Sequence, residues 1–212
     1  MMRRPAAVLG AVVLLAGLAG CATPDKPTRA TLYDFGPGAT AAQPSDPAAL
    51  LPSLVLADVA ASGAFESSAV LYRLGYADAN QLRPYAHARW SAPPQQLVRQ
   101  RLREQLARGR AVLDPGEGAA LRRSGGTEAR ILRLDLEEFS QLFDSEVQSW
   151  GLLRLRATLM DSTPAGQQLL AQRSFVVRQP APTPDAPGGV RALASATDTA
   201  AAEIAQWLAQ LP

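Results

Sequence analysis

Residues 131–159 read ILRLDLEEFSQLFDSEVQSWGLLRLRATL, and this stretch decides the fold. In residues 131–137 every second residue is leucine and the residues between are charged, and residues 153–159 repeat the alternation with arginine and threonine between apolar residues. Because successive side chains of a strand point to opposite faces, each segment has one dry face and one wet face. That pattern is typical of an antiparallel sheet covered on one side.

Further strand-like runs lie on both sides of this stretch. Residues 169–177 form a third run, and the turn residues from Asp161 to Gly166 predict a hairpin between it and the strand before it. Towards the amino terminus, strands are predicted over residues 54–59, 69–74, 84–90 and 111–113, with a short edge strand at Leu32-Tyr33-Asp34-Phe35. Two segments predict irregular structure: Asp114 to Gly126 through its glycines, and Gln179 to Gly188 through its four prolines.

Two segments have the helical period. After Pro93-Pro94, the apolar residues from Leu97 to Leu106 lie on one face of a predicted amphipathic helix over residues 94–108. Apolar residues from Val190 to Leu211 recur every three or four positions and predict a terminal helix. We therefore expect a single α+β domain over residues 50–212, in which two amphipathic helices pack on one face of a mostly antiparallel sheet.

The first twenty residues have the layout of a secretory signal peptide. Arg3 and Arg4 precede an uncharged apolar run that is shorter than the roughly 20 residues of a membrane-spanning helix. The tetrapeptide Leu18-Ala19-Gly20-Cys21 resembles the bacterial lipobox, in which cleavage before the cysteine accompanies acylation of its thiol and of the new amino terminus. We expect a signal peptide over residues 1–20, lipid attachment at Cys21, and an acylated tether with the edge strand over residues 21–49. The alternative is an ordinary cysteine after an ordinary signal.

Composition excludes several classes of function. One cysteine and one histidine rule out an intrachain disulfide framework and any cluster of cysteine or histidine metal ligands. Once Arg3 and Arg4 are removed, the 21 Lys and Arg residues fall by two to 19, which equals the 19 Asp and Glu residues. A neutral exported chain lacks the basic surface of a nucleic-acid-binding protein. We expect no nucleic-acid partner, no metal, and no cofactor apart from the covalent lipid on Cys21.

Titratable residues offer two candidate sites for chemistry. His87 could act as a general base beside a nucleophile such as Ser91. No nucleophile motif accompanies it, so we favour a strand histidine at a surface or interface. The second site is an acidic cluster that could hold a divalent cation or act as paired carboxylates: Asp135, Glu137, Glu138 and Asp144. Two of its members alternate with leucines, so we favour a solvated sheet face.

Three further segments could bind a partner. Five arginines could contact anionic headgroups or an acidic protein: Arg99, Arg101, Arg103, Arg108 and Arg110. They are distributed around the predicted helix and Glu104 interrupts them, so we favour a solvated helix. Three aromatic residues near a strand connection could form a hot spot, although core packing explains them better: Phe139, Phe143 and Trp150. The segment from Gln179 to Gly188 is either a contact element or an exposed connector.

One series of motifs resembles a known family. It runs Leu71-Tyr72-Arg73, Tyr85, Arg89-Trp90, Pro93-Pro94 and the helix from Leu97 to Leu106. This order resembles that of the ABC-type transport auxiliary lipoproteins, a family that includes the PqiC-like lipoproteins. Leu32 to Pro37 resembles the opening strand of that family, although Asp34-Phe35 replaces a more typical apolar residue and leucine, and Leu132 to Phe139 and Leu193 to Trp207 resemble its later strand and terminal helix.

The resemblance implies a noncatalytic lipoprotein subunit that is anchored to the outer membrane and faces the periplasm. Its implied partners are an MCE-domain protein and the associated ABC transporter, which move lipids or related apolar compounds between two membranes, and the implied assembly includes homo-oligomeric rings around the conduit. Ala22 in place of aspartate after Cys21 agrees with sorting to the outer membrane. The alternative function is a structural or assembly lipoprotein of the outer membrane on the same small fold. A periplasmic enzyme built on His87 is a third option.

Overall fold

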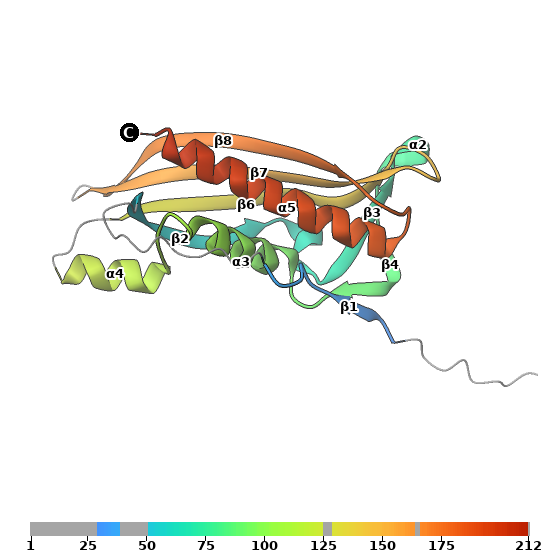
Figure 1. Cartoon of the computed structure of the whole chain (residues 1–212), viewed down its shortest axis with the longest axis horizontal. Coiled ribbons are helices and arrows are strands. Elements are labelled where there is room, and N and C mark those ends of the chain that lie inside the picture. The colour runs from blue at the N-terminus through green and yellow to red at the C-terminus, as the bar shows by residue number, and fades with distance from the viewer. Residues whose placement is uncertain (1–28, 39–50, 125–128, 164–165, 212) are drawn as a thin grey trace, which may run out of the picture.

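The computed structural model describes residues 29–38, 51–124, 129–163 and 166–211. The strands are β1 (Thr31–Tyr33), β2 (Leu51–Ala61), β3 (Ala69–Leu74), β4 (Ala79–Trp90), β5 (Arg110–Leu113), β6 (Arg130–Phe143), β7 (Ser149–Thr163) and β8 (Gly166–Pro180). The helices are a 3-10 turn η2 (Gly63–Glu66) and the α-helices α2 (Gly75–Asp78), α3 (Pro94–Leu106), α4 (Pro115–Arg123) and α5 (Ala186–Ala209). They form one α+β domain (Figure 1).

One mixed sheet of eight strands organises the domain around β6. On one side β6 pairs antiparallel with β7, and β7 continues antiparallel to β8. On its other side β6 pairs in parallel with β2 along its first half and with β3 along its last three residues. Parallel pairs β1·β4 and β2·β5 and the antiparallel pair β3·β4 complete the sheet.

The expectation of a mostly antiparallel sheet is therefore wrong. Alternation along a strand shows which face is dry, but it carries no information on the direction of the neighbouring strand. The hairpin of β7 and β8 is local in sequence and was predictable, whereas β2 and β3 both pair with β6, which is distant in the chain. These nonlocal pairs are the parallel ones.

Two helices cover one face of the sheet, as predicted (Figure 1). The apolar stripe of α3, from Leu97 to Leu106, and that of α5, from Val190 to Leu208, join the leucines of β2, β6 and β7 in one core. Gly151 on β7 brings α5 close, because a Cβ atom there would lie 2.6 Å from the backbone nitrogen of Leu193. Among the helices of the described residues, none combines the length and the hydropathy needed to span a membrane.

Two segments that we expected to be irregular contain helix. Residues 115–123, predicted as loop, form α4, which begins with Pro115 and is held by a capping box between Asp114 and Glu117. The backbone N–H of Asp114 donates to Glu117 Oε2 at 2.7 Å. In the proline-rich segment, β8 extends to Pro180 and α5 begins at Ala186, with Pro187 in its first turn where the missing N–H is harmless. Only the residues between them are irregular.

Candidate functional site

Cys21, the predicted site of lipid attachment, lies outside the described residues, so its acylation stays a prediction. The structure does describe where the amino-terminal segment joins the body. β1 pairs with β4 at one edge of the sheet, which confirms the predicted edge strand. Just after β1, the ring of Phe35 contacts Trp90, with centroids 5.5 Å apart, and Arg101 of α3 donates to the carbonyl oxygen of Phe35 at 2.6 Å.

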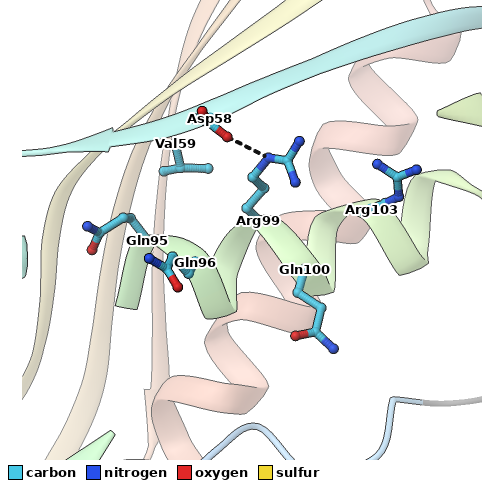
Figure 2. Close-up of a pocket in the computed structure, with 7 residues that line it drawn as sticks. All are labelled: Asp58, Val59, Gln95, Gln96, Arg99, Gln100 and Arg103. Carbon is cyan, nitrogen blue, oxygen red and sulfur yellow. Dashed lines mark ion pairs between the residues drawn. The ribbon is translucent and has the colours of Figure 1, made fainter. Parts of the chain in front are cut away.

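An open pocket of about 550 Å³ lies between β2 and α3. Figure 2 shows its lining, in which Arg99 of α3 reaches across to Asp58 of β2, and the two side chains form an ion pair of 3.3 Å. The other lining residues are mostly amides and a second arginine: Val59, Gln95, Gln96, Gln100 and Arg103. Among the described residues, the buried Oε1 atom of Gln95 has no hydrogen-bond partner.

The arginines of α3 connect elements and do not form a free basic surface. Arg99 and Arg103 both donate to Asp114 Oδ1 at 2.6 Å, which ties α3 to the start of α4. Arg101 pairs with Asp198 of α5 at 3.2 Å. The side chains of Arg99, Arg103 and Arg101 are 22%, 36% and 11% exposed, so the interpretation as a solvated helix is also incomplete. Arg110 lies on β5 and is buried.

Asp114 accepts hydrogen bonds from both Arg99 and Arg103. Its hydrogen bond from Arg99 is the main cause that holds the pKa of its carboxyl below the usual range, and the charge of Arg103 acts in the same direction. The carboxylate therefore stays ionised in mildly acidic solution. One acidic side chain thus orders two arginines of α3 and the first turn of α4.

The four acidic residues of the predicted cluster do not form one site. Asp135 and Glu137 lie on the sheet face away from α3 and α5 and pair with Arg156 and Arg154 of β7 at 3.3 and 3.1 Å, which agrees with a solvated sheet face. Glu138 is buried and pairs with Arg73, and Asp144 pairs with Arg178, both at 3.1 Å. In the described part of the chain, no group of three or more Asp, Glu, His or Cys side chains could hold a metal ion.

His87 is exposed on β4, as the surface interpretation predicts. Ser91 follows β4, and its backbone N–H donates to the carbonyl oxygen of Tyr33 at 2.7 Å, which ties this residue to β1. The structure thus offers no hydrogen bond between His87 and Ser91 among the described residues.

Phe139 and Phe143 are buried, and Phe139 contacts Trp90 with centroids 5.6 Å apart, which confirms the core-packing interpretation for these two residues. Trp150 is half-buried, donates to Asp144 Oδ2 at 2.7 Å, and lies under the guanidinium of Arg178. Residues 181–185 form the exposed connector between β8 and α5. Hydrogen bonds from Thr183 and from the N–H of Gly188 lower the pKa of Asp185.

The sequence did not predict the row of hydrogen-bonded polar side chains at the end of β6. The Tyr85 hydroxyl donates to Gln141 Oε1 at 2.7 Å, and Gln141 Nε2 donates to Ser149 Oγ at 2.8 Å. Burial raises the pKa of the Tyr85 phenol, so it remains a neutral donor. Because every member has a partner, this row specifies packing and offers no reactive group. The available signal was the unusual pair Ser140-Gln141 inside an otherwise apolar strand.

Comparisons with known proteins identify relatives of this fold. A model of the family described as "ABC-type transport auxiliary lipoprotein component" matches residues 33–205. The crystal structure of protein XCC0632 from Xanthomonas campestris is similar at 21% identity with a TM-score of 0.67, over 84% of this chain and 94% of that chain. That of an uncharacterized protein is similar at 16% identity with a TM-score of 0.61, over 85% of this chain and 99% of that one. No curated protein matches the chain.

Proposed function

The chain belongs to the ABC-type transport auxiliary lipoprotein component family, and from this we propose that it is a noncatalytic, lipid-anchored accessory subunit of a lipid transport system. Its proposed partners are an ABC transporter and an MCE-domain protein, and its proposed place is the outer-membrane end of a conduit across the periplasm. The observation that carries the proposal is the family match, which spans nearly all of the described body.

Cys21 supplies the proposed anchor. The sequence Leu18-Ala19-Gly20-Cys21 supports cleavage before the cysteine, with residues 1–20 as the signal peptide. One acyl chain holds a protein only marginally, at about 0.8 kcal/mol for each buried methylene, whereas several chains give durable attachment. A tether from Cys21 to β1 then connects the membrane to the edge of the sheet.

The side chains of α3 and of the pocket beside it suit a binding role and not catalysis. Arg99, Arg101 and Arg103 are engaged in ion pairs that fix α3 to its neighbours. The pocket between β2 and α3 is lined by the amide side chains of Gln95, Gln96 and Gln100, and amide groups suit hydrogen bonds to a polar segment of another protein. Assembly of several copies into a ring around the conduit belongs to the same proposal.

Copurification tests the proposal. The acylated protein, extracted in nonionic detergent and captured through a carboxyl-terminal tag, should bring down an MCE-domain protein and a transporter ATPase, identified by mass spectrometry. Cys21→Ala should lose the acyl mass and the membrane association while keeping a folded body, because the described core is formed by side chains between Leu54 and Leu208. Extracts in which the captured wild-type protein has neither partner would contradict the proposal.

A further inference from the structure

A small pocket of about 120 Å³ contains two arginines and lies where β2 begins and α5 ends (Figure 1). In the register of the sheet, Arg110 of β5 lies beside Leu51 and Arg130 of β6 lies beside Leu54, so the two arginines flank the first half of β2. The remaining walls are largely apolar and include Leu159, Leu208 and Leu211. We call this the arginine pocket.

Arg110 is the unusual member of the arginine pocket. Only 8% of the residue is exposed, and the causes of its pKa shift include no hydrogen bond and no carboxylate among the described residues. Buried arginines in folded proteins are normally paired, because an uncompensated buried charge is costly. Burial lowers the pKa of Arg110, and the positive charge of Arg130 lowers it further. Among the described residues, Arg110 thus lies near a second cation, Arg130, and no carboxylate pairs with it.

The chemistry of the walls indicates what would compensate this charge. Guanidinium groups bind phosphate and carboxylate oxygens through paired N–H donors, and two of them suit a phosphate group. The leucines cannot bond to such an anion, but they can contact acyl chains, and Leu51 at the rim is 41% exposed. Because the pocket has a volume of only about 120 Å³, a bound lipid would place its phosphate there and most of each acyl chain outside.

We propose that the arginine pocket binds the phosphate of an anionic phospholipid. Arg110 is the principal ligand of the phosphate, and the leucines of the pocket contact the first acyl carbons. The body of the protein then handles lipid directly, in addition to being held on a membrane by Cys21. The proposal does not depend on the identity of the transport partners. It can therefore fail while the proposed function stands, and the converse also holds.

Native mass spectrometry of the acylated full chain, with equal amounts of dihexanoyl phosphatidic acid and dihexanoyl phosphatidylcholine, tests the charge requirement. We expect one phosphatidic acid per chain, bound roughly tenfold more tightly than the zwitterionic lipid, since one charge-assisted contact has about that effect. Equal binding of the two lipids would overturn the proposal. A titration with inorganic phosphate separates the two sources of the anion: an affinity equal to that of the lipid would show a free-anion site and overturn the role of the leucines.

Arg110→Gln is the decisive variant. We expect about a tenfold loss of affinity for phosphatidic acid, together with a higher Tm of the ligand-free protein, because the substitution removes an uncompensated buried charge. An arginine with a purely structural role would give a lower Tm and unchanged lipid binding, and that result would overturn the proposal. Arg122→Gln, which changes an exposed arginine on α4, is the matched control and should alter neither quantity. Should Arg110→Gln fail to fold, Arg130→Gln takes its place, and unchanged binding by that variant would likewise overturn the proposal.

Discussion

Glu138 and Asp135 lie three residues apart on β6 in different surroundings. Glu138 pairs with Arg73 where the side chains are 11% and 20% exposed, whereas Asp135 pairs with Arg156 where they are 43% and 45% exposed. A shift of register between Leu136 and Glu138 places Glu138 opposite Arg154, on the same face as Asp135, which lies opposite Arg156. The two residues therefore differ in their surroundings along that face, where Glu138 pairs with Arg73 of β3. Ser140 Oγ also donates to Glu138 Oε1 at 2.7 Å.

The two ion pairs should therefore differ in their contribution to stability. Glu138→Gln leaves Arg73 without its carboxylate in a largely buried place, and we expect the free energy of unfolding to fall by about 2 kcal/mol. Asp135→Asn, the matched control in a solvated pair, should cost less than about 1 kcal/mol. Urea unfolding of both variants measures the two values, and equal losses would contradict this account of the two ion pairs.

Asp114 gives a dependence of stability on pH. The Arg99 hydrogen bond lowers the pKa of Asp114 in the folded protein below the value of about 3.9 expected in the unfolded chain. Its contribution is then fully present above the unfolded pKa and is lost as the pH falls through the folded pKa. We expect the stability difference between wild type and Asp114→Asn to be constant near neutral pH and to shrink below about pH 4. A difference that stays the same down to pH 2 would exclude this role for the Asp114 carboxylate.

Single residues were predictable only where the local pattern is regular. Alternation placed Asp135 and Glu137 correctly on a solvated face, but the alternation ends at Glu138, where the register of β6 shifts. The arginines of α3 were named, but their partners Asp58, Asp114 and Asp198 come from three other segments. Sequence spacing carries no signal for such contacts.

The helices show which features of an element the sequence determines. The stripes of α3 and α5 were predictable because a helix that covers a sheet must be apolar on one side. α4 lacks such a stripe, and its signals were the capping pair Asp114 and Glu117 with Pro115 between them. The direction of β2 and β3 relative to β6 was not predictable, since it depends on the path of the whole chain.

Gly151 controls the distance between α5 and β7. A Cβ atom at this position would lie 2.6 Å from backbone atoms of Ala192 and Leu193, which cannot move aside as a flexible side chain would. We expect Gly151→Ala to lower the free energy of unfolding by about 1–3 kcal/mol through this overpacking. Gly116→Ala on α4, where the added Cβ meets nothing within 4 Å, should be neutral or slightly stabilising. Thermal unfolding of the two variants provides the comparison, and a Gly151→Ala protein as stable as wild type would contradict the close packing.

Two edges of the sheet, β1 and β8, are the places where the molecule could join a membrane anchor or a partner. Its amino-terminal segment joins the sheet at β1, so a membrane anchor on Cys21 would lead to one edge of the sheet. The opposite edge is β8, which among the described strands pairs with β7 alone and exposes Leu169, Leu170 and Val176. These features agree with a subunit whose work is done by association, as the family membership implies.

The mass of the extracted assembly tests the proposed function most directly. Acylated protein purified in nonionic detergent should elute, by size-exclusion chromatography with light scattering, as a complex whose protein mass exceeds that of one chain and includes an MCE-domain protein. The matched Cys21→Ala protein, purified without its anchor, shows whether assembly depends on acylation. An acylated wild-type protein that elutes as a single chain of 22 kDa or less, with no partner at any detergent concentration that keeps it soluble, would contradict the account.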